Sequence, residues 1–137
     1  MNLSPFLLFE GNCAEAMIFY QSCLDGELTM TKVSDTPMKA HMPPQQHHKV
    51  VLAHLKAATM EIFATDWLHP SRTPKQGNTV AIYLSGGKYS ELRSIFDKFS
   101  VGAAPELLDD LRDMPFGSYG HLADKYGVHW FFQGDRP

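Results

Sequence analysis

The sequence predicts an α+β fold in which two βαβββ modules form a curved mixed sheet with the helices on its outer face. Residues 3–24 and residues 78–99 each contain a short apolar strand, a tight turn and a helix with one apolar stripe. The two helices align at a constant offset that takes Gly26 to Gly102, a step of 76. Three further short strands are expected after each helix, so the chain looks like two copies of one module.

The boundaries of the first strand and helix are indicated by particular residues. A short apolar run at 4–9 is typical of a strand, and Gly11 supplies the turn that follows it. Asn12 can cap the helix, and Glu15 three residues later can complete a capping box. Gly26 is placed to end the helix. The apolar stripe of this helix recurs at steps of three and four residues: Ala16, Phe19, Tyr20 and Cys23.

The rest of the first module reads as three strands and two polar segments. We expect the strands at residues 27–33, 49–56 and 59–65. Residues 34–48 form a polar loop that contains prolines. Residues 66–78 form a second loop, which we take as the boundary between the modules.

The second module repeats this order less clearly. A strand at 79–84 leads through Ser85-Gly86-Gly87 into the second helix. The glycine pair lacks the spacing of a phosphate-binding loop, so it predicts a plain turn. A weak strand follows Gly102, and residues 107–117 are ambiguous between a short helix and an irregular excursion. The chain closes as a hairpin of two strands, at 118–123 and 128–133.

Length and charge limit the class of protein. The 137 residues are enough for one domain with its own core, built from modules at about residues 1–66 and 78–137. A net charge of −3 gives no reason to expect nucleic acid or an anionic membrane as a partner. No apolar run has the length of a signal sequence or a membrane span. We therefore expect a cytoplasmic protein.

The two cysteines, Cys13 and Cys23, agree with a reducing compartment. They lie ten residues apart on one predicted helix, which separates them by roughly 15 Å along its axis and rules out a disulfide between them. We expect buried apolar thiols. The alternative is a catalytic thiolate at Cys13, because a helix N-terminus favours the charged form.

Alternation along the strands sorts their residues between a helix-covered face and a concave face. Aromatic residues on the concave face would form an apolar pocket for a small organic molecule. Alternatively, these residues form the core of an interface with the partner module or with a second chain. The expected ligand-binding residues are Leu7, Phe9, Phe63, Tyr83, Phe116, Tyr119 and Phe131.

Two segments carry a resemblance to a known family: SPFLLFEGNCAEAMIFYQ at 4–21 and YGHLADKYGVHWFF at 119–132. They resemble the PhnB-like, or 3-demethylubiquinone methyltransferase-like, branch of the vicinal oxygen chelate superfamily. That superfamily includes glyoxalase I, extradiol dioxygenases, fosfomycin-resistance enzymes and bleomycin-binding proteins. The resemblance implies a glyoxalase-like fold over the whole chain and a homodimer, because small members commonly build their clefts with a partner chain.

Enzymes of the superfamily usually hold a divalent metal with His and Glu side chains from the first and last strands of each module. Carried over to this chain, these positions are Pro5, Thr79, Phe131 and either Ile62 or Glu61. Pro and Phe cannot coordinate a metal through their side chains, and Thr is a poor ligand. We therefore expect neither the usual metal nor another cofactor.

A substitute catalytic set could be formed by His54, Glu61 and His129. All three side chains would face the cleft if the strands have the register that we prefer. Two histidines and a carboxylate could supply a general base near neutral pH, or could bind zinc or nickel. The alternative is that they are separate polar residues on a half-exposed sheet.

Two other groups are weaker candidates. The loop histidines His41, His47 and His48 have a spacing that fits no standard metal site, which favours a solvated loop or a flap over the cleft. Ser118 and His121, which shares a strand face with Tyr119, could suggest a nucleophile and its base. No acid partner is evident to orient the histidine.

These observations lead to three hypotheses. The first is a glyoxalase-like cleft protein that binds a small organic molecule without the superfamily's metal. The second is a metal-dependent lyase, isomerase, dioxygenase or thiol transferase of the vicinal oxygen chelate type. The third is a structural or interaction role, in which the aromatic face is the core of a dimer.

Overall fold

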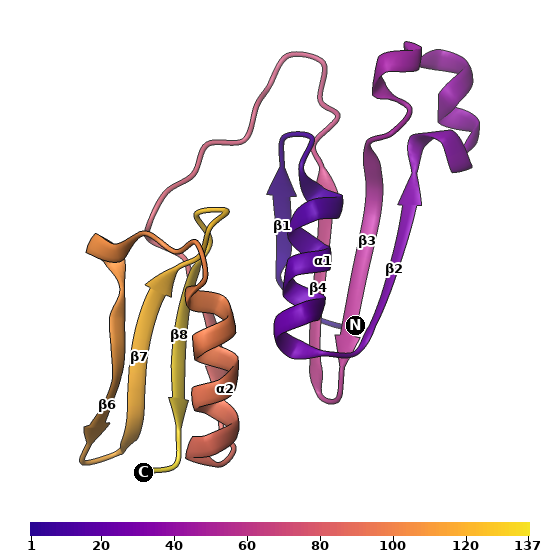
Figure 1. Cartoon of the computed structure of the whole chain (residues 1–137). Helices are drawn as coiled ribbons and strands as arrows, with labels where there is room; N and C mark the ends of the chain where they lie inside the picture. Colours follow the sequence, from indigo (N-terminus) through magenta and orange to yellow (C-terminus); the bar gives the residue numbers. More distant parts are fainter. The chain divides into compact units, whose positions relative to one another are not determined.

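The computed structural model describes residues 1–137, which divide into two compact units, Met1–Lys75 and Gln76–Pro137. The division falls within the segment that we expected to join the modules. Each unit contains four strands and one α-helix, in the order βαβββ (Figure 1). No helix in the structure combines the length and the hydropathy that crossing a lipid bilayer requires.

The first unit forms a mixed four-stranded sheet in the order β1-β4-β3-β2. Strands β1 and β4 are parallel, and the other two neighbouring pairs are antiparallel. Three short 3-10 helices, η1 to η3, fill the expected polar loop: Val33–Asp35, Pro37–His41 and Pro44–Gln46. The other elements are β1 (Phe6–Phe9), α1 (Cys13–Leu24), β2 (Glu27–Lys32), β3 (Val50–Ala57) and β4 (Met60–Asp66).

The second unit repeats this topology, with the sheet order β5-β8-β7-β6. The ambiguous segment 107–117 contains strand β6, and the weak strand expected after Gly102 is replaced by the short 3-10 helix η4 (Pro105–Leu107). The expected first strand is shorter and begins later than we predicted. The other elements are β5 (Ile82–Ser85), α2 (Tyr89–Ser100), β6 (Asp109–Met114), β7 (Gly117–Ala123) and β8 (His129–Gly134).

The offset of 76 between the helices is confirmed, because α1 and α2 each have 12 residues and begin at Cys13 and Tyr89. The structure also corrects the apolar stripe predicted for α1. Met17, which the prediction left out, is fully buried, whereas Phe19, which it included, is only half-buried. Three aligned pairs are each at most 2% exposed: Ala16 with Leu92, Tyr20 with Phe96, and Cys23 with Phe99. An α+β fold with two similar modules is therefore confirmed.

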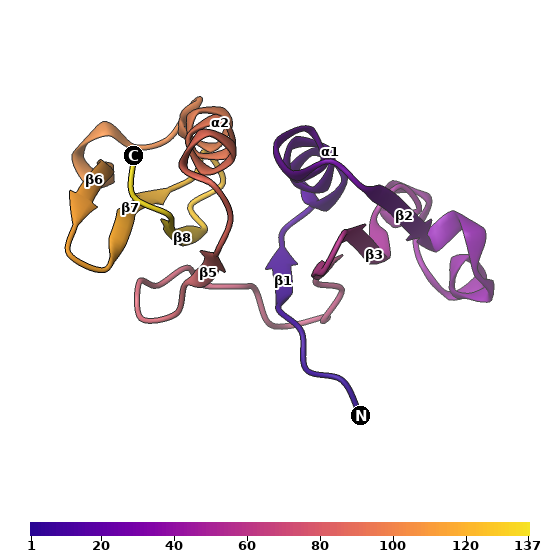
Figure 2. The same cartoon turned by 90° about the horizontal axis from the view of Figure 1, so that it is seen from below.

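The strands form two four-stranded sheets, one in each unit, where we expected one curved sheet. Within each unit the helix lies along one face of the sheet (Figure 2). The core of each unit lies between that helix and the sheet face beneath it, and the other face of the sheet carries no helix of the unit. We call the two faces the covered face and the open face.

The start of α1 depends on a residue that our capping prediction did not include. The Asn12 side chain makes no capping hydrogen bond, so the predicted capping box is wrong. Instead, the buried carboxylate of Asp66, at the end of β4, accepts hydrogen bonds from the backbone N–H groups of Gly11 (2.8 Å), Cys13 (3.0 Å) and Val50 (2.9 Å). One side chain thereby satisfies two donors at the helix start and one on β3.

Candidate functional site

The register of β1 assigns its residues to the two faces of the first sheet. Leu7 and Phe9 pair with Ala64 and Asp66, which are buried beneath α1. Leu7 and Phe9 therefore lie on the covered face, although we expected them to line the open one. Their neighbours Phe6 and Leu8 lie on the open face and are 55% and 45% exposed.

A histidine and a carboxylate are paired on the open face of the first sheet. The His54 Nε2 atom lies 2.6 Å from Glu61 Oε1, and the two residues come from the adjacent strands β3 and β4. The imidazole also stacks on the ring of Phe63, with 4.4 Å between centroids and 10° between planes. Because the carboxylate can only accept, the neutral imidazole has its proton on Nε2 and its lone pair on Nδ1. The pair is therefore arranged as a positioned base with an orienting carboxylate.

This register also decides between two positions that the sequence left open. Ile62 is 4% exposed and lies on the covered face, whereas Glu61 lies on the open face. Glu61 and His54 are thus brought together as expected. His129, the third member of the expected set, belongs to the second unit, where its partner is His121. Joint action of all three stays a prediction.

The open face of the second sheet carries a continuous row of rings, which we call the aromatic ladder. Its members, in order of contact, are Phe116, Tyr119, Phe131, His121 and His129. The centroids of successive rings are 5.6, 5.9, 4.3 and 5.4 Å apart. Tyr83 pairs with Phe131 in the strand register, and its hydroxyl donates a hydrogen bond to the side-chain oxygen of Gln133. Spacings of this kind are those of interacting aromatic pairs.

Two histidines end the ladder in a hydrogen bond between their rings. His121 Nε2 lies 3.2 Å from His129 Nδ1, and the other nitrogen of His121 lies 3.9 Å from Asp109 Oδ2. Because one ring must accept the shared proton, at least one of the two is neutral. Burial, and secondly the proximity of His129, lower the pKa of His121, while Asp109 opposes the change.

The sequence suggested His129 but missed His121 as its partner. The hairpin expected from the sequence could have indicated this pair, because β7 and β8 form a hairpin in which Ala123 pairs with His129. His121, two residues earlier on β7, is therefore a diagonal neighbour of His129 on the same face. Ser118, grouped with His121 in the sequence, is buried and donates its hydroxyl to the backbone carbonyl of Asp135. It cannot serve as an accessible nucleophile in this position.

The expected ligand-binding residues are distributed over both faces of the first sheet and over the second unit. Leu7 and Phe9 lie on the covered face of the first sheet, and Phe63 lies on its open face. The remaining four lie on the second unit: Tyr83, Phe116, Tyr119 and Phe131. The aromatic ladder is thus the largest group of these residues that the structure brings together.

The positions that the resemblance assigns to a metal do not fit one. Pro5 and Phe131 have no coordinating side-chain atom, and Thr79 lies before β5 rather than in it. Glu61 has a carboxylate, which is hydrogen-bonded to His54. Within neither unit do three His, Cys, Asp or Glu side chains gather in an arrangement that could hold a metal ion.

The alternative of a catalytic thiolate at Cys13 conflicts with its surroundings. Both cysteines are free and buried, and Cys13 is fully enclosed. Burial, and secondly the nearby Asp66 carboxylate, raise the pKa of the Cys13 thiol to about 12. The side chain therefore stays a neutral thiol at physiological pH and acts as a small apolar core residue.

Two βαβββ units, each with a helix on one face of its sheet, define a protein of the glyoxalase/bleomycin-resistance fold class. A glyoxylase/bleomycin resistance protein/dioxygenase domain from Frankia sp. EAN1pec has the same fold. It superposes with a TM-score of 0.65 at 13% identity, over 99% of this chain and 93% of that one.

Within this class, the chain belongs to the family described as 3-demethylubiquinone-9 3-methyltransferase, whose model matches residues 1–133. It is 28% identical to protein YjdN of Escherichia coli strain K12, over 95% of this chain and 92% of that protein. It also resembles the crystal structure of protein PA1353 from Pseudomonas aeruginosa, with 25% identity, a TM-score of 0.84, and coverage of 100% and 99% of the two chains. The resemblance to the PhnB-like branch is confirmed.

Proposed function

We propose that the protein binds a small organic molecule with a planar apolar part, which stacks on the aromatic ladder of the second unit. The observation that carries this proposal is the continuity of the ladder on a sheet face that α2 does not cover. Phe116, the first ring of the ladder, is 55% exposed, and Tyr83, which pairs with Phe131 in the strand register, is 57% exposed. Exposed apolar groups that adjoin one another mark binding surfaces more often than scattered ones do.

The polar groups at the ladder give the ligand a preferred chemistry. When both rings are neutral, the His121–His129 pair presents one N–H donor and one acceptor nitrogen at the two atoms outside the shared hydrogen bond. A ligand with a planar ring and one neutral hydrogen-bonding group would stack on Tyr119 or Phe131 and meet this pair. The family takes its description from a methyl-transfer reaction, and our proposal concerns binding alone.

The test is a calorimetric titration with indole, a neutral planar probe with one N–H group. We expect saturable binding to the unaltered protein, and binding at least about tenfold weaker in Tyr119→Ala, because a ring in the middle of the ladder is lost. Ile18→Ala is the control, since Ile18 is an exposed apolar residue on α1. Equal affinities in all three proteins, or no saturation, contradict the proposal. If Tyr119→Ala is unstable, Phe116→Ala replaces it.

We further propose that this binding needs no divalent metal, because Pro5, Thr79 and Phe131 occupy positions at which the superfamily's enzymes have metal ligands. Thermal unfolding with and without micromolar Ni²⁺, Zn²⁺ or Mn²⁺ tests this point. An ion that binds only the native state must raise the unfolding temperature. We expect no rise, and a large rise with any of the three ions contradicts the metal-free proposal.

A second candidate function, proton transfer on a bound substrate, is favoured by the 2.6 Å contact between His54 and Glu61. With Nε2–H directed to the carboxylate, Nδ1 can remove a proton from a carbon next to a carbonyl. An isomerase assay on the hemithioacetal of methylglyoxal and glutathione tests it. Activity that is lost in both His54→Ala and Glu61→Ala supports this candidate. Complete inactivity, or activity that both variants retain, contradicts it.

A homodimer is also proposed, because the open face of the first sheet carries the apolar side chains of Phe6, Leu8 and Leu52. Analytical ultracentrifugation should show a dimer that Leu8→Lys weakens at least about tenfold, since a charge in an apolar interface is costly. If the aromatic ladder is instead the dimer core, Tyr119→Ala weakens the dimer.

We also propose a cytoplasmic location, which the free thiols of Cys13 and Cys23 support.

A further inference from the structure

The first unit contains a pocket that is separate from the open face and that neither the resemblance nor the proposed function uses. It has a volume of about 460 Å³, which is within the usual range for small-molecule sites. One wall comes from the 3-10 segment and includes Met38, Met42 and Gln46. The opposite wall is the segment that follows β4 and includes Trp67 and His69.

Hydrogen bonds fix the two walls and the proton position of one lining histidine. His47 Nε2 lies 2.9 Å from the Met42 carbonyl oxygen, which anchors the first wall. The backbone N–H of Trp67 donates to the Phe9 carbonyl oxygen at 2.8 Å, which anchors the second wall. His69 Nδ1 accepts the backbone N–H groups of Ser71 and Arg72, at 3.1 and 3.0 Å. The neutral ring must therefore carry its proton on Nε2, as a hydrogen-bond donor.

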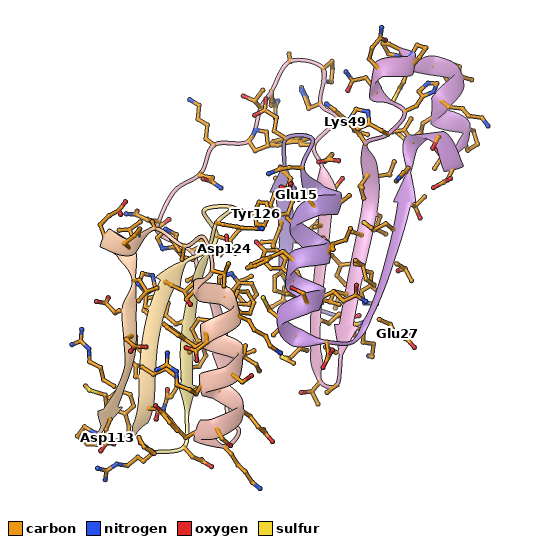
Figure 3. The ribbon with its side chains drawn as sticks, viewed as in Figure 1. Glu15, Glu27, Lys49, Asp113, Asp124 and Tyr126 are labelled. Carbon is orange, nitrogen blue, oxygen red and sulfur yellow. The ribbon has the colours of Figure 1, made fainter.

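The charged side chain that lines the pocket is positive, and no negative side chain balances it. Lys49 lies at the pocket, just before β3 (Figure 3), and no Asp or Glu side chain lines it. The ammonium of Lys49 and the Nε2–H donor of His69 would both favour an anion. The Trp67 ring and the Met38 and Met42 thioethers offer a polarizable apolar surface, to which a flat ring binds well. A ligand that matches both features has an aromatic ring and one negative charge.

We propose that this pocket is a second binding site, which takes a small aromatic monocarboxylate. The carboxylate pairs with Lys49 and accepts the proton of His69 Nε2, while the ring lies against Trp67. The proposal does not depend on the ligand of the aromatic ladder, because every lining residue belongs to the first unit.

The fluorescence of Trp67 provides a direct test, because the only other tryptophan, Trp130, is buried in the second unit. Titration with benzoate should change the emission saturably, and Trp67→Phe should abolish this change. Benzamide has the same ring without the charge, and we expect it to bind at least about tenfold more weakly. Equal responses to the two compounds, or no saturation with benzoate, overturn the proposal.

Substitutions of lysine separate a specific contact from general charge attraction. Lys49→Met should weaken benzoate binding at least about tenfold, and Lys49→Arg should largely retain it. The control is Lys56→Met, since Lys56 is exposed near the other end of β3. An equal loss in the Lys49→Met and Lys56→Met proteins overturns the proposal. Tyr119→Ala should not change benzoate binding, so this site and the proposed ladder site can fail separately.

Discussion

The two units share one topology, but each uses its buried aspartate for a different purpose. In the first unit, Asp66 joins the end of β4 to the start of α1 and to β3. In the second, Asp124 accepts the N–H groups of Tyr126 and Val128 and the indole N–H of Trp130, and so fixes the turn between β7 and β8 (Figure 3). The helical stripe is therefore the repeated feature, while the polar anchors are particular to each unit.

The open faces differ in the same way. The first carries a mixture of aliphatic and phenylalanine side chains with one histidine–carboxylate pair, and the second carries the aromatic ladder with a histidine pair. Since the stripe specifies the module, side chains on the open face are free to vary without loss of the fold. This difference locates the proposed ligand in the second unit and the candidate base in the first.

The largest effect that we predict comes from Asp66→Ala, which tests whether the anchor of the first unit is essential. Three N–H groups lose their carboxylate acceptor, and two of them, those of Cys13 and Val50, are buried. The free energy of unfolding should therefore fall by about 3–5 kcal/mol. Urea denaturation measures this change. Asp35→Ala is the control, because Asp35 accepts one N–H at an exposed turn, and it should cost about 1 kcal/mol or less. Similar losses in the two variants contradict the account.

Substitutions at one aligned pair test whether the stripe is the repeated feature. Leu92→Ala removes a buried side chain from the second unit and should cost about 2–5 kcal/mol. Ala16→Leu adds volume at the equivalent position in the first unit and should cost about 1–3 kcal/mol. Chemical denaturation of both proteins is the measurement. Tolerance of either change below about 0.5 kcal/mol would show that the two positions are not equivalent core sites.

Two glycines with the same φ angle should respond differently to substitution. Gly26 and Gly86 both have φ of +100°. A Cβ atom on Gly26 would collide with the backbone carbonyl of Lys56, whereas a Cβ atom on Gly86 meets open space. Gly86→Ala should cost about 1–2 kcal/mol from backbone strain alone. Gly26→Ala should cost at least about 1 kcal/mol more, and equal unfolding free energies of the two variants would refute this difference.

The smallest effect is a pH dependence specific to the second unit. Because the folded state lowers the pKa of His121, the unfolded chain binds its proton more readily below about pH 6.5. The contribution of the neutral His121 ring to the free energy of unfolding is complete above that pH. It is lost as the pH falls toward the lowered pKa. His121→Gln should therefore lose less stability than the unaltered protein between about pH 8 and pH 5.5. His129 and Asp109 remain in both proteins, so parallel profiles from urea denaturation would contradict this assignment.

The sequence predicted the helices well because their stripes are local patterns of three- and four-residue steps. It missed β6, since this edge strand contains Asp109, Asp110, Arg112 and Asp113. Charged residues protect an edge from pairing but carry no strand signal. The role of Asp66 was also hidden, because its contact with Gly11 joins residues that are 55 positions apart.

The candidate site could be predicted only in part. Hydrogen-bonded neighbours on a hairpin, such as His54 and Glu61, follow from the register of β3 and β4. Alternation along β1 separated Leu7 and Phe9 from Phe6 and Leu8, but it could not say which set faces the helix. That choice depends on the parallel pairing of β1 with β4, which is a contact between distant parts of the chain.

Amide NMR spectra recorded during a titration with indole test the central claim most directly. If the ligand stacks on the aromatic ladder, the shifts should concentrate on β7 and β8, around Tyr119, His121, His129 and Phe131. The shifts should saturate together and should be reduced in Tyr119→Ala. Shifts confined to the first unit, or no saturable shift in either unit, would contradict the account.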